Sequence, residues 1–129
     1  MSEQDVETIR GAYQSFNSGD IDGVLANLDE DVEWVEPGGG NSPSGAFRGP
    51  QSVGQDVFAA VPQNFDEFRA DPENFDDRGE EIVVTGHFKG KNKSGAELDS
   101  AFTHTYEMKD GKVVKLTNEV DEGWAAGWS

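Results

Sequence analysis

Cysteine is absent from this sequence of 129 residues. A chain without cysteine forms no disulfide and offers no thiolate ligand to a metal ion. Long apolar runs are missing too, because no stretch approaches the roughly 20 apolar residues that a membrane-spanning helix needs. The first ten residues, MSEQDVETIR, are too polar for a secretory signal. From these absences we expect a cytoplasmic protein that does not act on membranes.

Basic residues are scarce: ten Lys and Arg stand against 26 Asp and Glu, for a net charge of −16. Such a charge repels phosphate groups, so we do not expect nucleic acid as a partner. The acids are spread along the whole chain. We favour a halophilic surface as the explanation, because the Debye length shrinks to about 3 Å at 1 M salt and self-repulsion is then screened. An acidic protein without salt adaptation is the alternative.

Hydrophobic residues make up only 34% of the chain, but eight Phe, three Trp and two Tyr provide large side chains for a core. A chain of this length is typical of one domain around one core. The regular apolar spacing described next argues against disorder. We therefore expect residues 1–129 to form a single domain.

Apolar spacing predicts three helices in the first half of the chain. The apolar positions of the first helix recur at helical intervals and are Val6, Ile9, Tyr13 and Phe16. Gly19 is typical of the end of this helix, and Asp20 of the cap of a short second one. Pro50 favours the start of a third helix, which we expect Pro62 to end.

The rest of the chain has the pattern of strands. A first strand is expected at about 32–36, followed by a Gly- and Pro-rich loop at 37–47. Four further strands are predicted at 65–75, 81–89, 97–109 and 112–121. Asp110-Gly111 between the last two is a strong hairpin signal. Helices first and strands last indicate an α+β fold, with helices covering one side of a curved, mostly antiparallel sheet.

The tail at 122–129 is small and polar except for Trp124 and Trp128. Two such large apolar side chains are expected to be buried against another surface. A second subunit is one candidate for that surface.

Three stretches resemble known proteins, and together they cover nearly the whole chain. They are YQSFNSGDIDGVLANLDEDVEWVEPGG at 13–39, FRGPQSV at 47–53 and AFTHTYEMKDGKVVKLTNEVD at 101–121. They resemble the ketosteroid isomerase and SnoaL-like polyketide cyclase branch of the nuclear transport factor 2-like superfamily. The resemblance implies a cone-shaped α+β barrel with three N-terminal helices, a deep apolar pocket and homodimers. It does not fix the chemistry, because one fold can carry several functions.

Glu36 is the first candidate catalytic residue. It alternates with Val32 and Trp34, so the three side chains share one face of the strand. Its place before a proline resembles that of the isomerase's general base. Apolar surroundings raise the pKa of a carboxyl group toward the range useful for proton transfer. The alternative is a solvated Glu at a strand end.

Tyr13 and His104 are candidates for holding an enolate oxygen. Tyr13 lies on the apolar stripe of the first helix and resembles the isomerase's oxyanion tyrosine. His104 takes the place of the family's protonated aspartate if the hairpin is one residue shorter; otherwise Thr103 does. In either alignment the protonated aspartate of the isomerases is missing from this sequence. SnoaL-like sequences often carry a histidine at this position. The alternatives are a core tyrosine and a core histidine.

Asp121 resembles the acidic residue that SnoaL-like cyclases use as acid and base. Strand alternation instead turns Val114, Leu116, Asn118 and Val120 inward and Asp121 outward. Only a bend or bulge near the strand end would bring Asp121 into the pocket. Asn118 is the better inward hydrogen-bonding candidate.

These residues predict a pocket for a small apolar or aromatic molecule, lined by Trp34, Phe58, Phe102 and Asn118. The expected chemistry is proton removal next to a carbonyl, leading to isomerisation or aldol-type cyclisation without metal or cofactor. The two histidines lack metal-ligand spacing. The alternatives are a non-catalytic ligand-binding or dimerisation module of the same fold, and a structural protein whose pocket is filled by Phe and Trp side chains.

Overall fold

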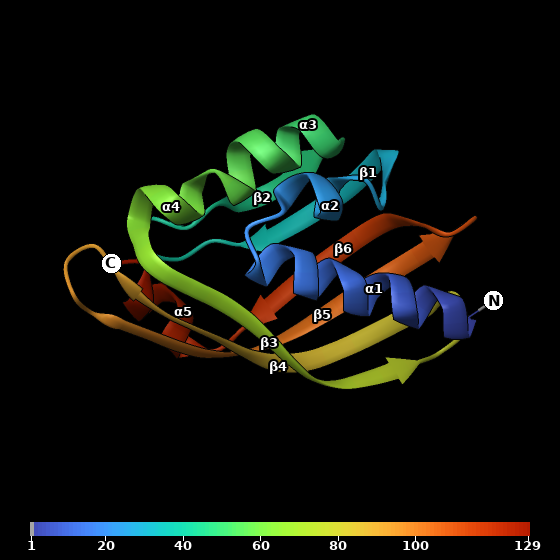
Figure 1. Cartoon of the computed structure of the whole chain (residues 1–129). Helices are drawn as coiled ribbons and strands as arrows, with labels where there is room; N and C mark the ends of the chain where they lie inside the picture. Colours follow the sequence, from blue (N-terminus) through green and yellow to red (C-terminus); the bar gives the residue numbers. More distant parts are fainter. Residues whose placement is uncertain (1) are drawn as a thin grey trace.

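The computed structural model describes residues 2–129 and contains a six-stranded sheet with helices packed against it (Figure 1). The helical elements are α1 (Ser2–Asn17), α2 (Ile21–Leu25), α3 (Pro50–Ser52), the π-helix η1 (Val53–Phe58), α4 (Ala60–Asn64) and α5 (Glu122–Gly127). The strands are β1 (Leu28–Pro37), β2 (Ser44–Arg48), β3 (Phe65–Asp77), β4 (Glu81–Asn92), β5 (Glu97–Lys109) and β6 (Lys112–Val120). The α+β class and the predicted β5–β6 hairpin are confirmed.

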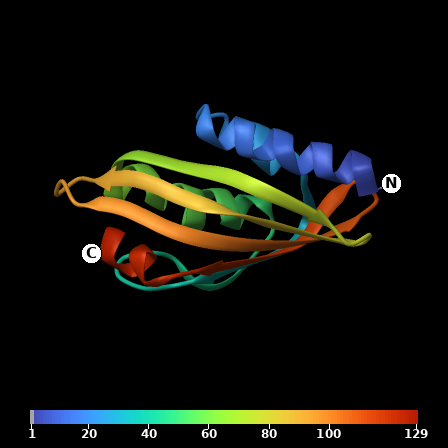
Figure 2. The ribbon, with the colours of Figure 1, turned by 90° about the horizontal axis from the view of Figure 1, so that it is seen from below.

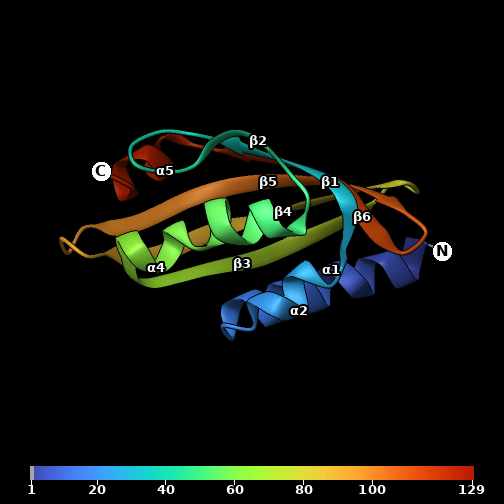
Figure 3. The same ribbon diagram turned by 90° about the horizontal axis from the view of Figure 1, so that it is seen from above.

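The sheet has the strand order β2-β1-β6-β5-β4-β3, and every neighbouring pair is antiparallel except β1–β6. It curves around the helices, and α1 packs along β3 (Figure 2). Seen from above, the α3–α4 segment lies between β3 and the β1–β2 end of the sheet (Figure 3). The expected curved, mostly antiparallel sheet is confirmed.

Two glycines of β4 allow β3 to come close where the sheet bends. A Cβ atom at Gly86 would collide with the carbonyl oxygen of Asp71, and one at Gly90 with that of Glu67. The β3–β4 register also shifts between Pro72 and Asn74. Close backbone contact and a bulge together produce the strong local bend that closes the cone.

The edge strand β2 overlaps the end of the stretch at 37–47 that was predicted to be a loop. Gly45 and Ser44 pair with Glu36 and Pro37 of β1. Gly38, which has a φ of 74°, is one of three consecutive glycines that turn the chain between the two strands. The prediction was wrong here because a short, Gly- and Ser-rich edge strand lacks the apolar alternation that identifies strands from sequence.

The third helical segment continues past Pro62, contrary to expectation. The element η1 has the hydrogen-bond pattern of a π-helix, in which an N–H bonds to the carbonyl five residues earlier. The Ala59 N–H, for example, bonds to the Gly54 carbonyl. Pro62 then falls in the first turn of α4, where a missing N–H is tolerated. The segment ends at Asn64 instead.

The tail packs on its own chain and needs no second subunit to bury its tryptophans. Trp124 and Trp128 are 3% and 2% exposed. The ring of Trp128 lies 4.8 Å from Phe65 and 5.3 Å from Trp124 between centroids. Asn92 fixes the end of α5 by donating from Nδ2 to the Gly127 carbonyl. α5 therefore forms one wall of the interior.

A bulge in β6 changes which of its side chains face inward, compared with the prediction. Val113 pairs with Met108, but Lys115 pairs with Glu107, so Val114 is the extra residue. As a result Val113 is buried and Val114 is only half-buried. Beyond the bulge, Leu116 and Asn118 point inward as expected.

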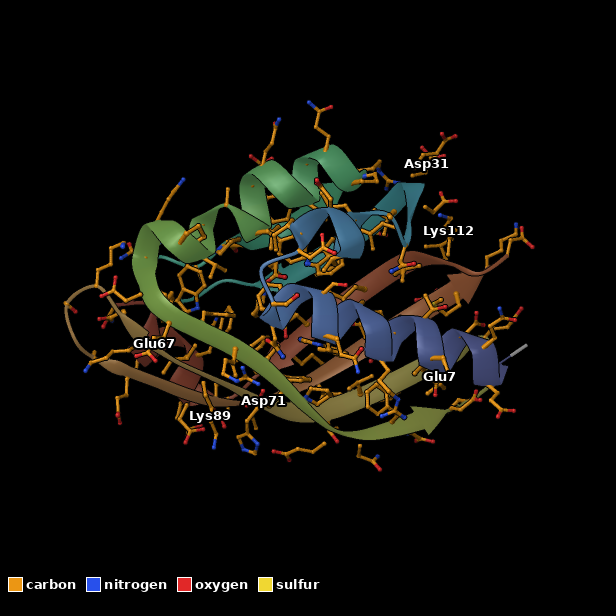
Figure 4. All side chains as sticks on the ribbon, in the orientation of Figure 1. Glu7, Asp31, Glu67, Asp71, Lys89 and Lys112 are labelled. Carbon is orange, nitrogen blue, oxygen red and sulfur yellow. The ribbon has the colours of Figure 1, made fainter. Side chains whose placement is uncertain are left out.

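Many acidic side chains project from the outer surface (Figure 4). Within the described residues, six carboxylates form ion pairs, against 26 acids in the sequence. Exposed pairs of this kind contribute little, about 0–1 kcal/mol each. Repulsion among the remaining acids is therefore largely uncompensated at low salt. None of the helices in the part of the chain that the structure describes is long and apolar enough to cross a membrane.

We predict that the protein becomes more stable as KCl rises from low to molar concentration, because salt screens this repulsion. Thermal denaturation followed by circular dichroism measures the effect. Most of the gain should come at the lowest KCl concentrations, where the Debye length changes most. A midpoint that is unchanged or lower in KCl contradicts the prediction.

Candidate active site

A cavity opens between the inner face of the sheet and the helices α1, η1, α4 and α5. The space inside it that water-sized groups can occupy is about 70 Å³. A cavity needs only about 10–15 Å³ of such space to hold one water molecule. The Phe and Trp side chains therefore leave free space in the interior, whereas a purely structural protein predicts that they fill it.

Aromatic side chains make up about half of the residues that line the cavity. All three tryptophans and both tyrosines of the chain line it: Tyr13, Trp34, Tyr106, Trp124 and Trp128. Four of the eight phenylalanines join them: Phe16, Phe58, Phe68 and Phe88. Some of these rings pack edge to face, as Trp34 and Phe58 do with centroids 5.4 Å apart, and others are tilted, as Trp124 and Trp128 are. The wall suits a planar apolar ligand.

Glu36 places a carboxylate in this aromatic wall, near the end of β1. It is 7% exposed, and Oε2 accepts a hydrogen bond from Trp34 Nε1 at 2.6 Å. Oε1 accepts from Asn118 Nδ2 at 3.2 Å. Burial raises the pKa of Glu36 from 4.5 to about 7, although both hydrogen bonds act in the opposite direction. Near neutral pH Glu36 is thus poised between its acid and its base form.

Tyr13, Tyr106 and His104 form a second polar group in the cavity. The Tyr106 hydroxyl donates to the Tyr13 oxygen at 2.9 Å, and Tyr13 Oη lies 2.6 Å from His104 Nδ1. His104 and Tyr106 share the inner face of β5, whereas Tyr13 comes from α1. Burial raises the pKa of both phenols, so both stay protonated at neutral pH.

His104 is uncharged at neutral pH because burial lowers its pKa to about 3. A neutral imidazole carries one proton, and the hydrogen bond at the other nitrogen decides which atom holds it. Because Tyr106 donates to the Tyr13 oxygen, the Tyr13 proton is free to bond Nδ1, and we assign the proton of His104 to Nε2 on this basis. His104 then acts as an acceptor for Tyr13 and not as a cationic acid.

Asn118 connects the two polar groups. The parallel pairing of Val35 with Thr117 brings it beside Glu36, and the antiparallel pairing of β5 with β6 puts it opposite His104. Its Oδ1 makes no hydrogen bond of good geometry within the described residues. The side chain is still close enough to His104 to favour the protonated imidazole. Asn118 thus lies between the proposed base and the tyrosine–histidine group.

The structure brings most of the predicted site residues together. Glu36, Tyr13, His104 and Asn118 line one cavity, as do Trp34 and Phe58. Phe102 is buried but does not line the cavity; it stacks on His104 with centroids 4.0 Å apart. Its place behind the imidazole supports the ring and is not a ligand contact.

Asp121 lies outside the cavity, as strand alternation indicated. β6 ends before it without the inward bend that its predicted acid–base role needs. Its carboxylate caps α5 by accepting from the Gly123 N–H at 2.8 Å, and it also accepts from the Ala101 N–H at 3.0 Å. These backbone bonds lower the pKa of the exposed Asp121. We assign it a helix-capping role.

Tyr106, Phe88 and the two tail tryptophans were not predicted as site residues, yet all line the cavity. Tyr106 had a usable signal, because it alternates with His104 along β5. The positions of Trp124 and Trp128 depend on how α5 folds back, which no local pattern specifies. In residues 2–129 no group of three or more His, Asp or Glu side chains is arranged to hold a metal ion.

Comparison with protein families identifies the class of this fold and cavity. Residues 9–116 match the model of the SnoaL-like domain. The chain belongs to the SnoaL-like domain family. A search of curated proteins found no match to the chain.

Solved structures agree with this assignment. An NTF2-like protein of unknown function from Burkholderia pseudomallei is 28% identical with a TM-score of 0.83, covering 92% of this chain and 91% of its own. TerC, crystallised with polyporic acid, is 28% identical with a TM-score of 0.82 and 92% coverage of both chains. Bal32a, from a soil-derived mobile gene cassette, has a TM-score of 0.89 at 23% identity, covering 99% and 98%, and supports the fold alone.

We predict that Glu36→Gln changes stability in a pH-dependent way. The pKa of Glu36 is raised in the folded state, so its favourable contribution is present at about pH 4 and lost as pH rises through about 7. The variant, which mimics the protonated acid, should gain roughly 3 kcal/mol relative to the native protein between about pH 4 and pH 8. Urea denaturation at several pH values measures this difference. Glu30→Gln, an exposed change on the same strand, is the control; parallel curves for all three proteins would refute a buried Glu36.

Proposed function

We propose that the cavity binds a small apolar or aromatic carbonyl compound and that Glu36 removes a proton from the carbon next to the carbonyl. The enolate formed would then be reprotonated, giving isomerisation, or attack a second carbonyl, giving aldol-type cyclisation. The observation that carries this proposal is a buried carboxylate in the wall of an open aromatic cavity.

Glu36 has the properties of a general base. A carboxylate in water is too weak a base to act efficiently near pH 7, whereas a group with a pKa of about 7 is both basic and substantially ionised. Trp34 and Asn118 hold both oxygens by hydrogen bonds and so fix the orientation of the carboxylate. That fixed orientation is what proton transfer from a bound ligand requires.

Tyr13 is the group best suited to stabilise the enolate oxygen. Its hydroxyl receives a hydrogen bond from Tyr106, which increases its ability to donate. A ligand oxygen beside Tyr13 would compete with His104 Nδ1 for the Tyr13 proton. In this proposal His104 holds the Tyr13 hydroxyl in place until a ligand enters, and Tyr106 supports it during the reaction.

The relatives support binding of a small organic molecule. The family is the SnoaL-like domain family, and TerC, at 28% identity over 92% of the chain, was crystallised with polyporic acid. By analogy we propose that the corresponding cavity in this chain is a ligand site.

A non-catalytic ligand-binding module is the second candidate. It is favoured by one observation: the hydroxyl groups of Tyr13 and Tyr106 are both already engaged in hydrogen bonds within the protein. A binding module needs no free donor for an enolate. The homodimer expected from the resemblance stays a prediction for either function.

Exchange of solvent deuterium into enolisable ketones tests the proposal. In D₂O the native protein should catalyse exchange at the carbon next to the carbonyl of small aromatic ketones, followed by NMR. Glu36→Gln should reduce the rate by about 10²–10⁴-fold, the usual contribution of a general base. The rate should rise with pH and level off above about pH 7, because only ionised Glu36 accepts a proton.

Glu30→Gln is the matched control for charge removal and should leave exchange unchanged. Ketones that bind without exchange, in the native protein and in Glu36→Gln alike, would contradict catalysis and support the binding module.

A further inference from the structure

Glu36 is a buried carboxylate without a cation. Among the described residues that line the cavity it is the only Asp or Glu, and none of them is Lys or Arg. The ion pairs that the described residues form all involve other carboxylates. A carboxylate removed from water is stabilised by a proton or by a cation. The lining described here supplies no cation, so a cationic partner for ionised Glu36 would have to come with a ligand.

The aromatic wall has no cation of its own either. A substituted ammonium group is attracted to the faces of aromatic rings, most strongly to tryptophan. One such contact is recorded within residues 2–129, Arg10 over Phe75 at 4.4 Å, and Phe75 does not line the cavity. Trp34 donates to Glu36 through its ring nitrogen, so the carboxylate lies at the edge of that ring and not over its face. An ammonium group beside Glu36 is attracted by the carboxylate, and its substituents contact the aromatic side chains that line the same cavity.

The net charge of the whole chain also favours a cationic ligand. A net charge of −16 produces a negative potential, and a cleft with low-dielectric walls concentrates it. Cations are thus drawn toward the cavity, whereas carboxylates and phosphates are repelled.

The hydrogen bonds of Glu36 specify the kind of cation. Both of its oxygens already accept a bond, from Trp34 and Asn118. A primary ammonium brings three N–H donors that need acceptors. Beside Glu36 the lining offers Asn118 Oδ1, which has no partner within the described residues, and most of the other lining side chains are apolar. A tertiary or quaternary ammonium brings one donor or none, and its methyl groups pack against rings.

We infer that the cavity binds small organic cations, with a tertiary or quaternary ammonium group between the Glu36 carboxylate and the neighbouring aromatic rings. The apolar remainder of the ligand occupies the rest of the cavity. This inference goes beyond the proposed function, because it requires no reaction at Glu36.

Two ligands of the same shape test the inference directly. Benzyltrimethylammonium and neopentylbenzene differ in having a charged nitrogen or a neutral carbon at one position. Their binding is measured by intrinsic fluorescence, since all three tryptophans line the cavity. At pH 8 we expect the cation to bind at least about tenfold more tightly. Equal or weaker binding of the cation, or no saturable signal from either ligand, overturns the inference.

Two variants identify the carboxylate responsible. Glu36→Gln should abolish the preference for the cation and leave neopentylbenzene binding unchanged, so the neutral ligand also reports that the cavity is intact. Glu30→Gln removes an exposed charge from the same strand and should keep the preference. A preference that survives in Glu36→Gln would show that the general negative charge, and not the site, attracts the cation.

The effect of pH gives a second readout. Lowering the pH from 8 to 6 protonates Glu36 and should weaken binding of the cation but not of the neutral ligand. The other titratable groups of the cavity keep their charge in this range: His104 stays neutral because its pKa is about 3, and the pKa values of Tyr13 and Tyr106 are raised. Ketone exchange is measured separately, so failure of the proposed reaction leaves this result intact, and the reverse also holds.

Discussion

Burial of the Glu36 carboxylate is the constraint on which the rest of the site depends. An acid side chain in an aromatic wall is tolerated because Trp34 and Asn118 each donate a hydrogen bond to it. Those donors are in place because β1 pairs in parallel with β6, which sets Glu36 beside Asn118. The same sheet face carries His104 and Tyr106. Fold and site are therefore linked through one strand pairing: a slip of one residue there would turn Glu36 to the outer face.

The site keeps its charge close to zero at neutral pH. Glu36 is half ionised near pH 7, His104 is neutral, and both tyrosines are protonated. A fixed cation in the cavity would stabilise the carboxylate and make it a weaker base. The described lining contains no Lys or Arg. This favours both roles that we propose for Glu36, as a base for a carbonyl compound and as the partner of a ligand cation. The two uses differ in what the ligand brings, an acidic C–H bond or a positive charge.

Local sequence patterns predicted those parts of the molecule that depend on neighbouring residues. Alternation along β1 and β5 was enough to place Glu36 and His104 inside, and helical spacing was enough for Tyr13. The patterns failed where packing between segments distant in the sequence determines the local structure. The edge strand β2 exists because β1 offers it a partner, and Trp128 joins the cavity because α5 folds back. Phe102 was correctly placed on the inner face, but His104 covers it.

The most direct test of this account is the pKa of Glu36. Carboxyl NMR titration of the native protein in molar KCl, with Glu36→Gln to assign the signal, measures it. We predict a pKa of about 7, because the carboxylate is desolvated in the aromatic wall. A pKa near the ordinary 4.5 would mean a solvated surface acid, and would contradict both the proposed base and the proposed partner for a cation.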